Sequence, residues 1–361
     1  MRLSSKIIGI NALFMIPGGV GGTEQHLHAT LSTLEKLDNK HSYVVFCNRE
    51  NYDAFHFTNP LWKKVLCPIR ATTRPVRIIY EQVVLPFLVL KERCSFLHSF
   101  GYFGPIISPC KHIITVHDCN WLDYPTDFGI VERLVLKILI EINLNFSHAI
   151  MSVSEFTKSR LIHHFPNIAN KIVVIQSRVS EEFLKEAEKN HVNPLKNQRY
   201  ILTVGGMYPH KKVPYVLDIW KELQKSDKSL HLVIIGKNGK DEKYVVQRLK
   251  TLVRTHYFPS VSLKTLVSFY TFADMCVFPS VYEGFGYPLY EAMTLDRKIC
   301  VGKKDVYLES VQGHINELSF DIQRDTQLLI RIIKNNNIKH KKINNPEAPI
   351  QKLLNIYATF I

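Results

Sequence analysis

Short apolar runs alternate with longer segments of helical periodicity along the whole chain. The apolar runs are rich in Ile, Val, Leu and Phe and predict buried parallel strands: Lys6–Phe14, Tyr43–Cys47, Phe96–His98, Ile113–Val116, Ala149–Val153, Tyr200–Val204, Leu230–Ile235, Met275–Phe278 and Ile299–Val301. The segments between them predict helices over Glu24–Leu37, Tyr80–Lys91, Phe156–His164, Val213–Gln224, Lys243–Thr255 and Leu263–Phe272. This alternation predicts right-handed βαβ units with parallel sheets.

A polar stretch, residues 186–199, interrupts the pattern and has no apolar periodicity. We interpret it as a linker between two doubly wound, Rossmann-like α/β domains, residues 1–185 and 200–345, that face each other across a cleft. A Lys- and Asn-rich segment, Arg331–Asn345, ends the second domain, and an apolar helix within residues 346–361 is expected to dock back on the body.

Composition narrows the choice of partners. The chain has 361 residues, 46% of them hydrophobic and 22% charged, which is typical of a folded protein. Its formal net charge is +14 and its pI is near 9.3, so nucleic acid, an anionic membrane or phosphorylated substrates fit the surface. Because no nucleic-acid motif is present, we expect no nucleic-acid partner; a merely basic soluble protein is the other reading.

Two apolar segments raise the question of a membrane. The first, Ile7–Pro17, lacks a small-residue cleavage site and is interpreted as a core strand, not a signal peptide. The second, Val131–Ile150, predicts an amphipathic helix that either packs on the core or touches a membrane; it carries Glu132, Arg133, Lys137 and Glu141. No run reaches ~18 uninterrupted apolar residues, so no transmembrane helix is expected.

The seven cysteines include no C-x-x-C pair. Reduced thiols and a cytoplasmic location are therefore expected, with no disulfide framework. Cys110, His112, His117 and Cys119 lie near one another in the sequence, but their spacing matches no zinc pattern, and no metal is expected.

The run E-G-F-G-Y-P-L-Y-E places Glu283 and Glu291 on either side of a glycine turn. It follows a predicted strand, and Pro288 is suited to the first turn of a helix. Helix N-termini bind phosphate, and carboxylates accept hydrogen bonds from hydroxyls. The segment therefore predicts a site for a nucleotide-sugar.

Three other turns lie at predicted strand ends. The first, Pro17–Glu24, contains Gly21 and Gly22 and lets the backbone approach a phosphate, but its spacing breaks the dinucleotide fingerprint of a dehydrogenase. His117-Asp118 follows another strand, where His117 is either a hydrogen-bond donor to a sugar, with Asp118 setting its tautomer, or a structural histidine. The third turn, Gly205–Lys212, supplies two lysines suited to a diphosphate.

Together these segments resemble the retaining glycosyltransferases of family four, which have the GT-B fold. The resemblance covers nearly the whole chain. Within the family, the chain is similar to bacterial cell-surface polysaccharide mannosyltransferases. The motifs that carry it are G-G-V-G-G-T-E, Y-E-Q-V-V-L-P, T-V-H-D, V-S-E-F-T-K-S-R-L, V-G-G-M-Y-P-H-K-K and F-P-S followed by E-G-F-G-Y-P-L-Y-E. Two positions depart from the family pattern: Gly206 stands where many relatives have Arg, and Q-S-R-V-S (Gln176–Ser180) replaces a common P-N-G-V-D.

The resemblance also implies roles for individual residues. Glu283 would contact the hydroxyls of the donor sugar and Glu291 the ribose. Lys211, with Lys212 as the alternate, would neutralise the diphosphate, and His117 would lie near the sugar. Backbone groups would approach the donor at Gly21, Gly22, Gly206, Gly284, Phe285 and Gly286.

The expected function is metal-independent transfer of a hexose from a GDP- or UDP-linked donor to a glycan or lipid-linked hydroxyl, with retention. The nucleotide-sugar is a co-substrate, and no cofactor is expected. The N-terminal domain would serve the acceptor and the C-terminal domain the donor, with peripheral contact at the inner face of an anionic membrane. The alternatives are a catalytically weak sugar-nucleotide or glycan-binding protein of the same fold, or a GT-B epimerase.

Overall fold

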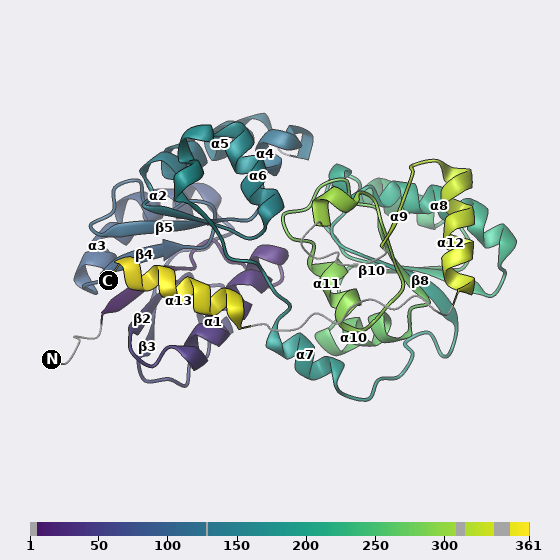
Figure 1. Ribbon diagram of the computed structural model, residues 1–361, viewed down its shortest axis with the longest axis horizontal. Helices are drawn as coiled ribbons and strands as arrows, with labels where there is room; N and C mark the ends of the chain where they lie inside the picture. The colour runs from purple at the N-terminus through teal and green to yellow at the C-terminus, as the bar shows by residue number, and fades with distance from the viewer. Residues whose placement is uncertain (1–5, 128, 308–314, 336–346, 361) are drawn as a thin grey trace. The chain divides into compact units, whose positions relative to one another are not determined.

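The chain folds into two compact α/β units (Figure 1), as seen in a computed structural model that describes residues 6–127, 129–307, 315–335 and 347–360. Both units are discontinuous in sequence. The first comprises Met1–Leu122, Ile130–Ser180 and Asn345–Ile361, and the second comprises Asp123–Gly129 and Glu181–Asn344.

The first unit contains a seven-stranded parallel sheet in the order β3-β2-β1-β4-β5-β6-β7. The strands are β1 (Ile7–Asn11), β2 (Ser42–Cys47), β3 (Trp62–Leu66), β4 (Phe96–Ser99), β5 (Lys111–Val116), β6 (Ala149–Ser152) and β7 (Ile172–Val174). Nearly all residues of the five central strands are buried, which explains their near-continuous apolar sequence. In register, Ile10 of the central strand β1 lies between Val45 and His98.

Helices connect these strands: α1 (Gly22–Leu37), α2 (Arg74–Val83), α3 (Leu85–Lys91), α4 (Asn120–Asp123), α5 (Ile130–Phe146) and α6 (Glu155–His164). The single helix predicted over Tyr80–Lys91 was wrong in its extent. The helical segment begins earlier, at Arg74, and divides at Val84. Pro86 has no N–H to donate to the carbonyl of Gln82, so the helical hydrogen-bond pattern is interrupted there, which accounts for the division.

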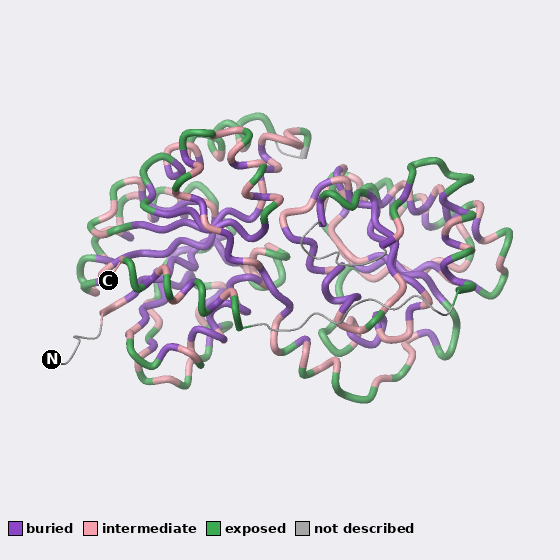
Figure 2. Tube along the Cα trace, viewed as in Figure 1, coloured by how far each residue is buried: buried purple, intermediate pink, exposed green. Residues whose placement is uncertain are grey.

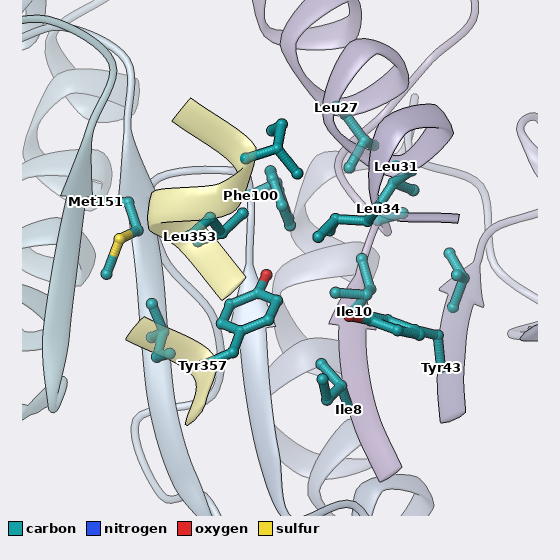
Figure 3. Close-up of a cluster of buried hydrophobic side chains, with 14 of the residues drawn as sticks. Ile8, Ile10, Leu27, Leu31, Leu34, Tyr43, Phe100, Met151, Leu353 and Tyr357 are labelled. Atoms are coloured by element: carbon teal, nitrogen blue, oxygen red, sulfur yellow. The ribbon is translucent and has the colours of Figure 1, made fainter. Parts of the chain in front are cut away.

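The late helix α13 (Ala348–Phe360) belongs to the first unit and packs beside α1 (Figures 1 and 3). Its buried residues Ile350, Leu353 and Tyr357 join the cluster formed by β1, β2 and α1. The Tyr357 hydroxyl lies 2.6 Å from Nδ1 of the buried His98 on β4. The core of the first unit is thus completed by a segment far along the chain.

The second unit contains a six-stranded parallel sheet in the order β10-β9-β8-β11-β12-β13. The strands are β8 (Arg199–Val204), β9 (Leu230–Ile235), β10 (Thr255–Phe258), β11 (Met275–Phe278), β12 (Ile299–Val301) and β13 (Asn316–Glu317). The helices are α7 (Glu181–Ala187), α8 (Val213–Ser226), α9 (Glu242–Leu249), α10 (Leu263–Phe272), α11 (Tyr287–Thr294) and α12 (Ile322–Lys334). As Figure 2 shows, burial in both units is concentrated along the strands.

Three details differ from the sequence-based expectations. The helix predicted over Lys243–Thr255 ends at Leu249. Thr255 instead begins strand β10, which pairs with β9. The contact boundary between the units falls after Ser180, ahead of the expected linker at 186–199, because α7 packs on α10. Arg331, placed in the Lys- and Asn-rich segment, lies in the last turn of α12, while residues 336–346 lie outside the described residues.

In both sheets the strand order reverses at one place, between β1 and β4 in the first unit and between β8 and β11 in the second. Open α/β sheets bind ligands at the carboxyl ends of the strands beside such a switch point. In the described part of the chain, no helix is both long enough and apolar enough to cross a membrane.

Candidate active site

A hollow of about 290 Å³, open to solvent, lies at the switch point of the second unit. One wall is the end of β8 and its turn, which include Val204, Gly205 and Gly206, and the other follows the end of β11. Lys211, Ser280, Glu283, Gly286 and Tyr307 also line it. The hollow therefore lies where the topology alone predicts a ligand.

Lys211 and Glu283 meet inside this hollow. The Lys211 Nζ lies 2.5 Å from the Glu283 Oε2, and both side chains are largely buried, with exposures of 22% and 11%. Lys211 ends a short turn, Pro209–Lys211, that follows β8, whereas Glu283 follows β11. Seventy-two positions separate the two residues in sequence, and the neighbouring strand ends bring them together. The pair is a charge-assisted hydrogen bond in a partly water-excluded site.

Lys212 is oriented differently from its neighbour. It adopts the left-handed conformation, with φ of 50°, and serves as the N-cap residue of α8. Its side chain is exposed and it does not line the hollow. Of the two lysines considered from the sequence, Lys211 is therefore the one that reaches the site.

The glycine turn before α11 has a specific steric requirement. Gly286 is left-handed, with φ of 89°, and a Cβ atom there would lie 2.5 Å from the Tyr307 ring. This close approach admits only glycine, and as the N-cap residue of α11 Gly286 brings no side chain over the helix N-terminus. Gly286, Pro288 and Leu289 of this turn all line the hollow.

The rest of the paired-glutamate segment packs beneath the turn. Phe285 stacks on Tyr290 with ring centroids 4.0 Å apart, so its side chain is buried, and Gly284 is partly exposed. Glu291 is almost wholly buried, and its Oε2 accepts a hydrogen bond of 2.8 Å from the Tyr270 hydroxyl. Burial and the adjacent Glu291 charge raise the pKa of Tyr270. Glu291 is not among the residues that line the hollow.

His117 lies in the first unit, directly after β5, and is almost completely buried. Its Nε2 lies 2.7 Å from the Phe100 carbonyl oxygen, which can only accept, so Nε2 carries the proton. Burial lowers the pKa of His117 to about 4, and the ring is neutral at pH 7. The Phe100 carbonyl, and not the neighbouring Asp118 suggested by the sequence, sets the tautomer. Nδ1 is left as a hydrogen-bond acceptor.

Gly21 and Gly22 are exposed at the start of α1, also in the first unit. Gly21 is the N-cap residue, with a positive φ of 58°, and nothing lies within 4 Å of a Cβ built on it. The turn therefore leaves room at the N-terminus of a 16-residue helix.

Tyr307 is the site residue that sequence reasoning missed. It lies in the short turn Lys304–Tyr307 after β12 and is buried against the hollow. Burial, followed by the charge of Glu283, raises the pKa of Tyr307, whose hydroxyl also interacts with Ser280 and Glu283. No sequence motif marks Tyr307. Its place at the hollow follows from the packing of its ring against Gly286, which only the fold shows. Within the described ranges, no group of three or more His, Cys, Asp or Glu is placed to hold a metal.

Solved structures with the same architecture identify the fold. The chain is similar to the Anabaena protein HepE in complex with UDP and glucose, with a TM-score of 0.68 at 14% identity over 98% of this chain and 100% of that one. It is also similar to WaaG, a glycosyltransferase involved in lipopolysaccharide biosynthesis, with a TM-score of 0.66 at 13% identity over 97% and 99%. A third similar structure is a putative UDP-N-acetylglucosamine 2-epimerase from Listeria monocytogenes, with a TM-score of 0.69 at 10% identity over 99% of this chain and 97% of that one. The fold is GT-B.

Sequence comparison then identifies the family. Residues 20–182 match the family described as Glycosyltransferase Family 4, and residues 185–345 match Glycosyl transferases group 1. The chain belongs to the glycosyltransferases of family four. Two curated relatives are the O-antigen chain mannosyltransferase RfbU of Salmonella typhimurium, 24% identical over 70% of this chain and 67% of the relative, and the O-antigen chain mannosyltransferase B of Escherichia coli, 27% identical over 51% of each.

Proposed function

We propose that this glycosyltransferase moves a hexose from a nucleotide diphosphate sugar to a hydroxyl of a glycan or lipid-linked acceptor, with retention of configuration. The observation that carries the proposal is the Lys211–Glu283 pair in the hollow at the end of β8 and β11. The two curated relatives named as mannosyltransferases support a hexose as the transferred group. Retention rests on the resemblance to family four.

Lys211 supplies a positive charge for the diphosphate of the donor, and Glu283 supplies a carboxylate for its sugar. As the glycosidic bond loosens, negative charge grows on the leaving diphosphate, and the Lys211 ammonium with the first turn of α11 would stabilise it. Binding of the diphosphate would draw Lys211 from Glu283, and the freed carboxylate would accept hydrogen bonds from sugar hydroxyls. Glu283 and Lys211 thus keep each other neutralised until the donor arrives.

Three further residues complete the proposal. Glu291, held by Tyr270, would bind the ribose. In family four the leaving phosphate itself helps to deprotonate the acceptor, and we propose the same route here. From the resemblance to family four, we propose that His117 contributes Nδ1 as an acceptor for the sugar. Because the Lys211 cation occupies the place of a metal in this scheme, activity should survive a chelator.

The two adjacent lysines give a matched test. Thermal shifts with UDP- and GDP-hexoses identify the donor first, and turnover is then measured with it. Lys211→Ala is expected to lower turnover roughly a hundredfold, by analogy with removal of one charge-stabilising donor. Lys212→Ala, which removes an equal charge from an exposed position, should leave turnover nearly unchanged. Full activity of Lys211→Ala would refute the assignment.

The two glutamates separate the roles of sugar and ribose. Glu283→Ala should mainly lower turnover, whereas Glu291→Ala should mainly weaken donor binding, as measured by calorimetry. Effects of both variants on affinity alone would contradict the assignment. Slow hydrolysis of the donor without acceptor would separate an enzyme from a sugar-nucleotide-binding protein.

A further inference from the structure

Helices α2 and α3 in the first unit carry five apolar side chains outward. Val76, Ile79, Val83, Phe87 and Leu90 recur at helical spacing and are all exposed, Phe87 by 69%. The opposite face of α2 buries two charged residues, Arg77 and Glu81. The Arg77 guanidinium lies over the Phe103 ring, and Glu81 accepts a hydrogen bond from Asn11. This arrangement reverses the usual surface helix, which turns its charged side chains to water.

Helix α5 is apolar on both of its faces. Ile140 and Leu144 are buried on the side of the sheet. Ile130, Val131, Leu134, Val135 and Ile138 project on the other side, and all five are exposed, Ile130 by 90%. The sequence left open whether this helix packs on the core or touches a membrane. In the structure one side of the helix is buried and an apolar side is exposed.

An ion pair at one end and a hydrogen-bonded bridge through Gly104 at the other link α2 to α5. Arg74 at the start of α2 forms an ion pair with Glu132 at the start of α5. Near the other ends, Gln82 donates to the carbonyl of Gly104, whose N–H donates to Asn143 of α5. The exposed apolar side chains of α2, α3 and α5 therefore lie on linked helices of the first unit, and we call them together the apolar face. A surface of this kind marks an interaction site.

The most exposed charges around the apolar face are of one sign. In residues 70–93 and 130–146, every charged side chain in the exposed class is basic: Arg70, Arg74, Lys91, Arg93, Arg133 and Lys137. Glu92, Glu132 and Glu141 are less exposed and each pairs with a Lys or Arg. The fitting partner is therefore apolar and anionic. A second copy of this chain would bring the same cations into opposition in a two-fold contact.

We propose that the apolar face docks on an anionic phospholipid bilayer, with the α2, α3 and α5 side chains in the acyl boundary and the cations at the headgroups. Apolar burial and attraction to anionic lipid act together in such binding. Docking would hold the first unit of the enzyme at a membrane surface. The inference rests on residues of the first unit alone and does not depend on the proposed donor site.

Vesicle sedimentation of the full chain tests the proposal. The probes are vesicles of phosphatidylcholine alone and vesicles of phosphatidylcholine mixed with phosphatidylglycerol. The variant Ile79→Gln/Phe87→Gln/Leu134→Gln removes three apolar side chains from the face without changing charge. Its matched control, Val192→Gln/Val253→Gln, alters exposed apolar residues of the second unit.

The wild type and the control should bind the phosphatidylglycerol vesicles, with partition lowered by salt, and should bind phosphatidylcholine weakly. The triple variant should lose about tenfold or more in partition. Unchanged donor binding by that variant shows that it is folded and separates this test from that of the donor site. Equal binding to both kinds of vesicle, or no binding by the wild type, would overturn the proposal. So would a wild-type dimer that only the triple variant dissociates.

Discussion

Acid should unfold the first unit, because four of its histidines are buried and held neutral. They are His26, His98, His112 and His117, and each is almost wholly enclosed. Burial is the main cause that lowers the pKa of all four, to about 3 for His112 and to about 4 for His117. Their hydrogen-bond partners include Ser177, Ser99 and the Phe100 carbonyl.

The size of the effect follows from proton linkage. Above the unfolded pKa of about 6.5 both states are neutral and the histidines contribute nothing to pH dependence. Below it the unfolded chain binds protons that the folded unit refuses, so at about pH 5.5 each histidine lowers the free energy of unfolding by about 1.4 kcal/mol. Four together lower it by about 6 kcal/mol, a large part of the roughly 5–15 kcal/mol of a typical domain. The loss continues down to the folded pKa of each ring. Glu81 acts in the opposite direction, because burial raises its pKa.

Urea unfolding followed by tryptophan fluorescence measures this dependence. Trp62 and Trp121 lie in the first unit and Trp220 in the second, so a Trp220→Phe background reports the first unit alone. The unfolding free energy should fall steeply between about pH 7.5 and 5.5, and His112→Asn should reduce that slope by about a quarter. An unfolding free energy that is the same at both pH values would refute the reasoning.

Two substitutions test packing described above. Gly286→Ala should destabilise the second unit by about 2 kcal/mol or more and abolish transfer, because φ is 89° and the Tyr307 ring blocks the new methyl group. Thermal unfolding measures the loss of stability. The control Gly129→Ala, at a position where nothing lies within 4 Å of the new Cβ, should behave as wild type. Tyr357→Phe should cost about 1–3 kcal/mol by leaving the buried His98 Nδ1 without its partner. An unchanged melting temperature would contradict that cost, and the exposed Tyr244→Phe is its control.

The sequence was most informative where burial imposes one pattern. Leu230–Ile235, Met275–Phe278 and Ile299–Val301 were predicted with the bounds that the structure shows, because central parallel strands are apolar on both faces. The short or mixed strands β3, β7, β10 and β13 were not predicted. β3 reads W-K-K-V-L at the sheet edge, where Lys63 is exposed and Lys64, on the opposite face, donates to the carbonyls of Tyr52 and Phe55.

The site was only partly accessible from sequence. Topology predicts that turns after β8 and β11 share an edge, so Lys211 and Glu283 were both named, although their direct contact was not foreseen. Tyr307 gives no sequence signal. Periodicity locates the apolar stripe of α2 but does not say which side faces the core, and the buried Arg77 and Glu81 show that here the charged side does. The roles of the named residues toward a donor stay predictions until the variants are measured.

The placement of α13 has a consequence for synthesis of the protein on the ribosome. The second unit is almost entirely encoded by one continuous stretch, Glu181–Asn344, so nearly all of its chain is available before α13 is made. Synthesis of the first unit begins earlier, but this unit lacks Ile350, Leu353 and Tyr357 until the second unit has been translated. Its sheet must therefore wait with an uncovered patch beside α1, a state that a fragment ending at Ser180 would retain permanently.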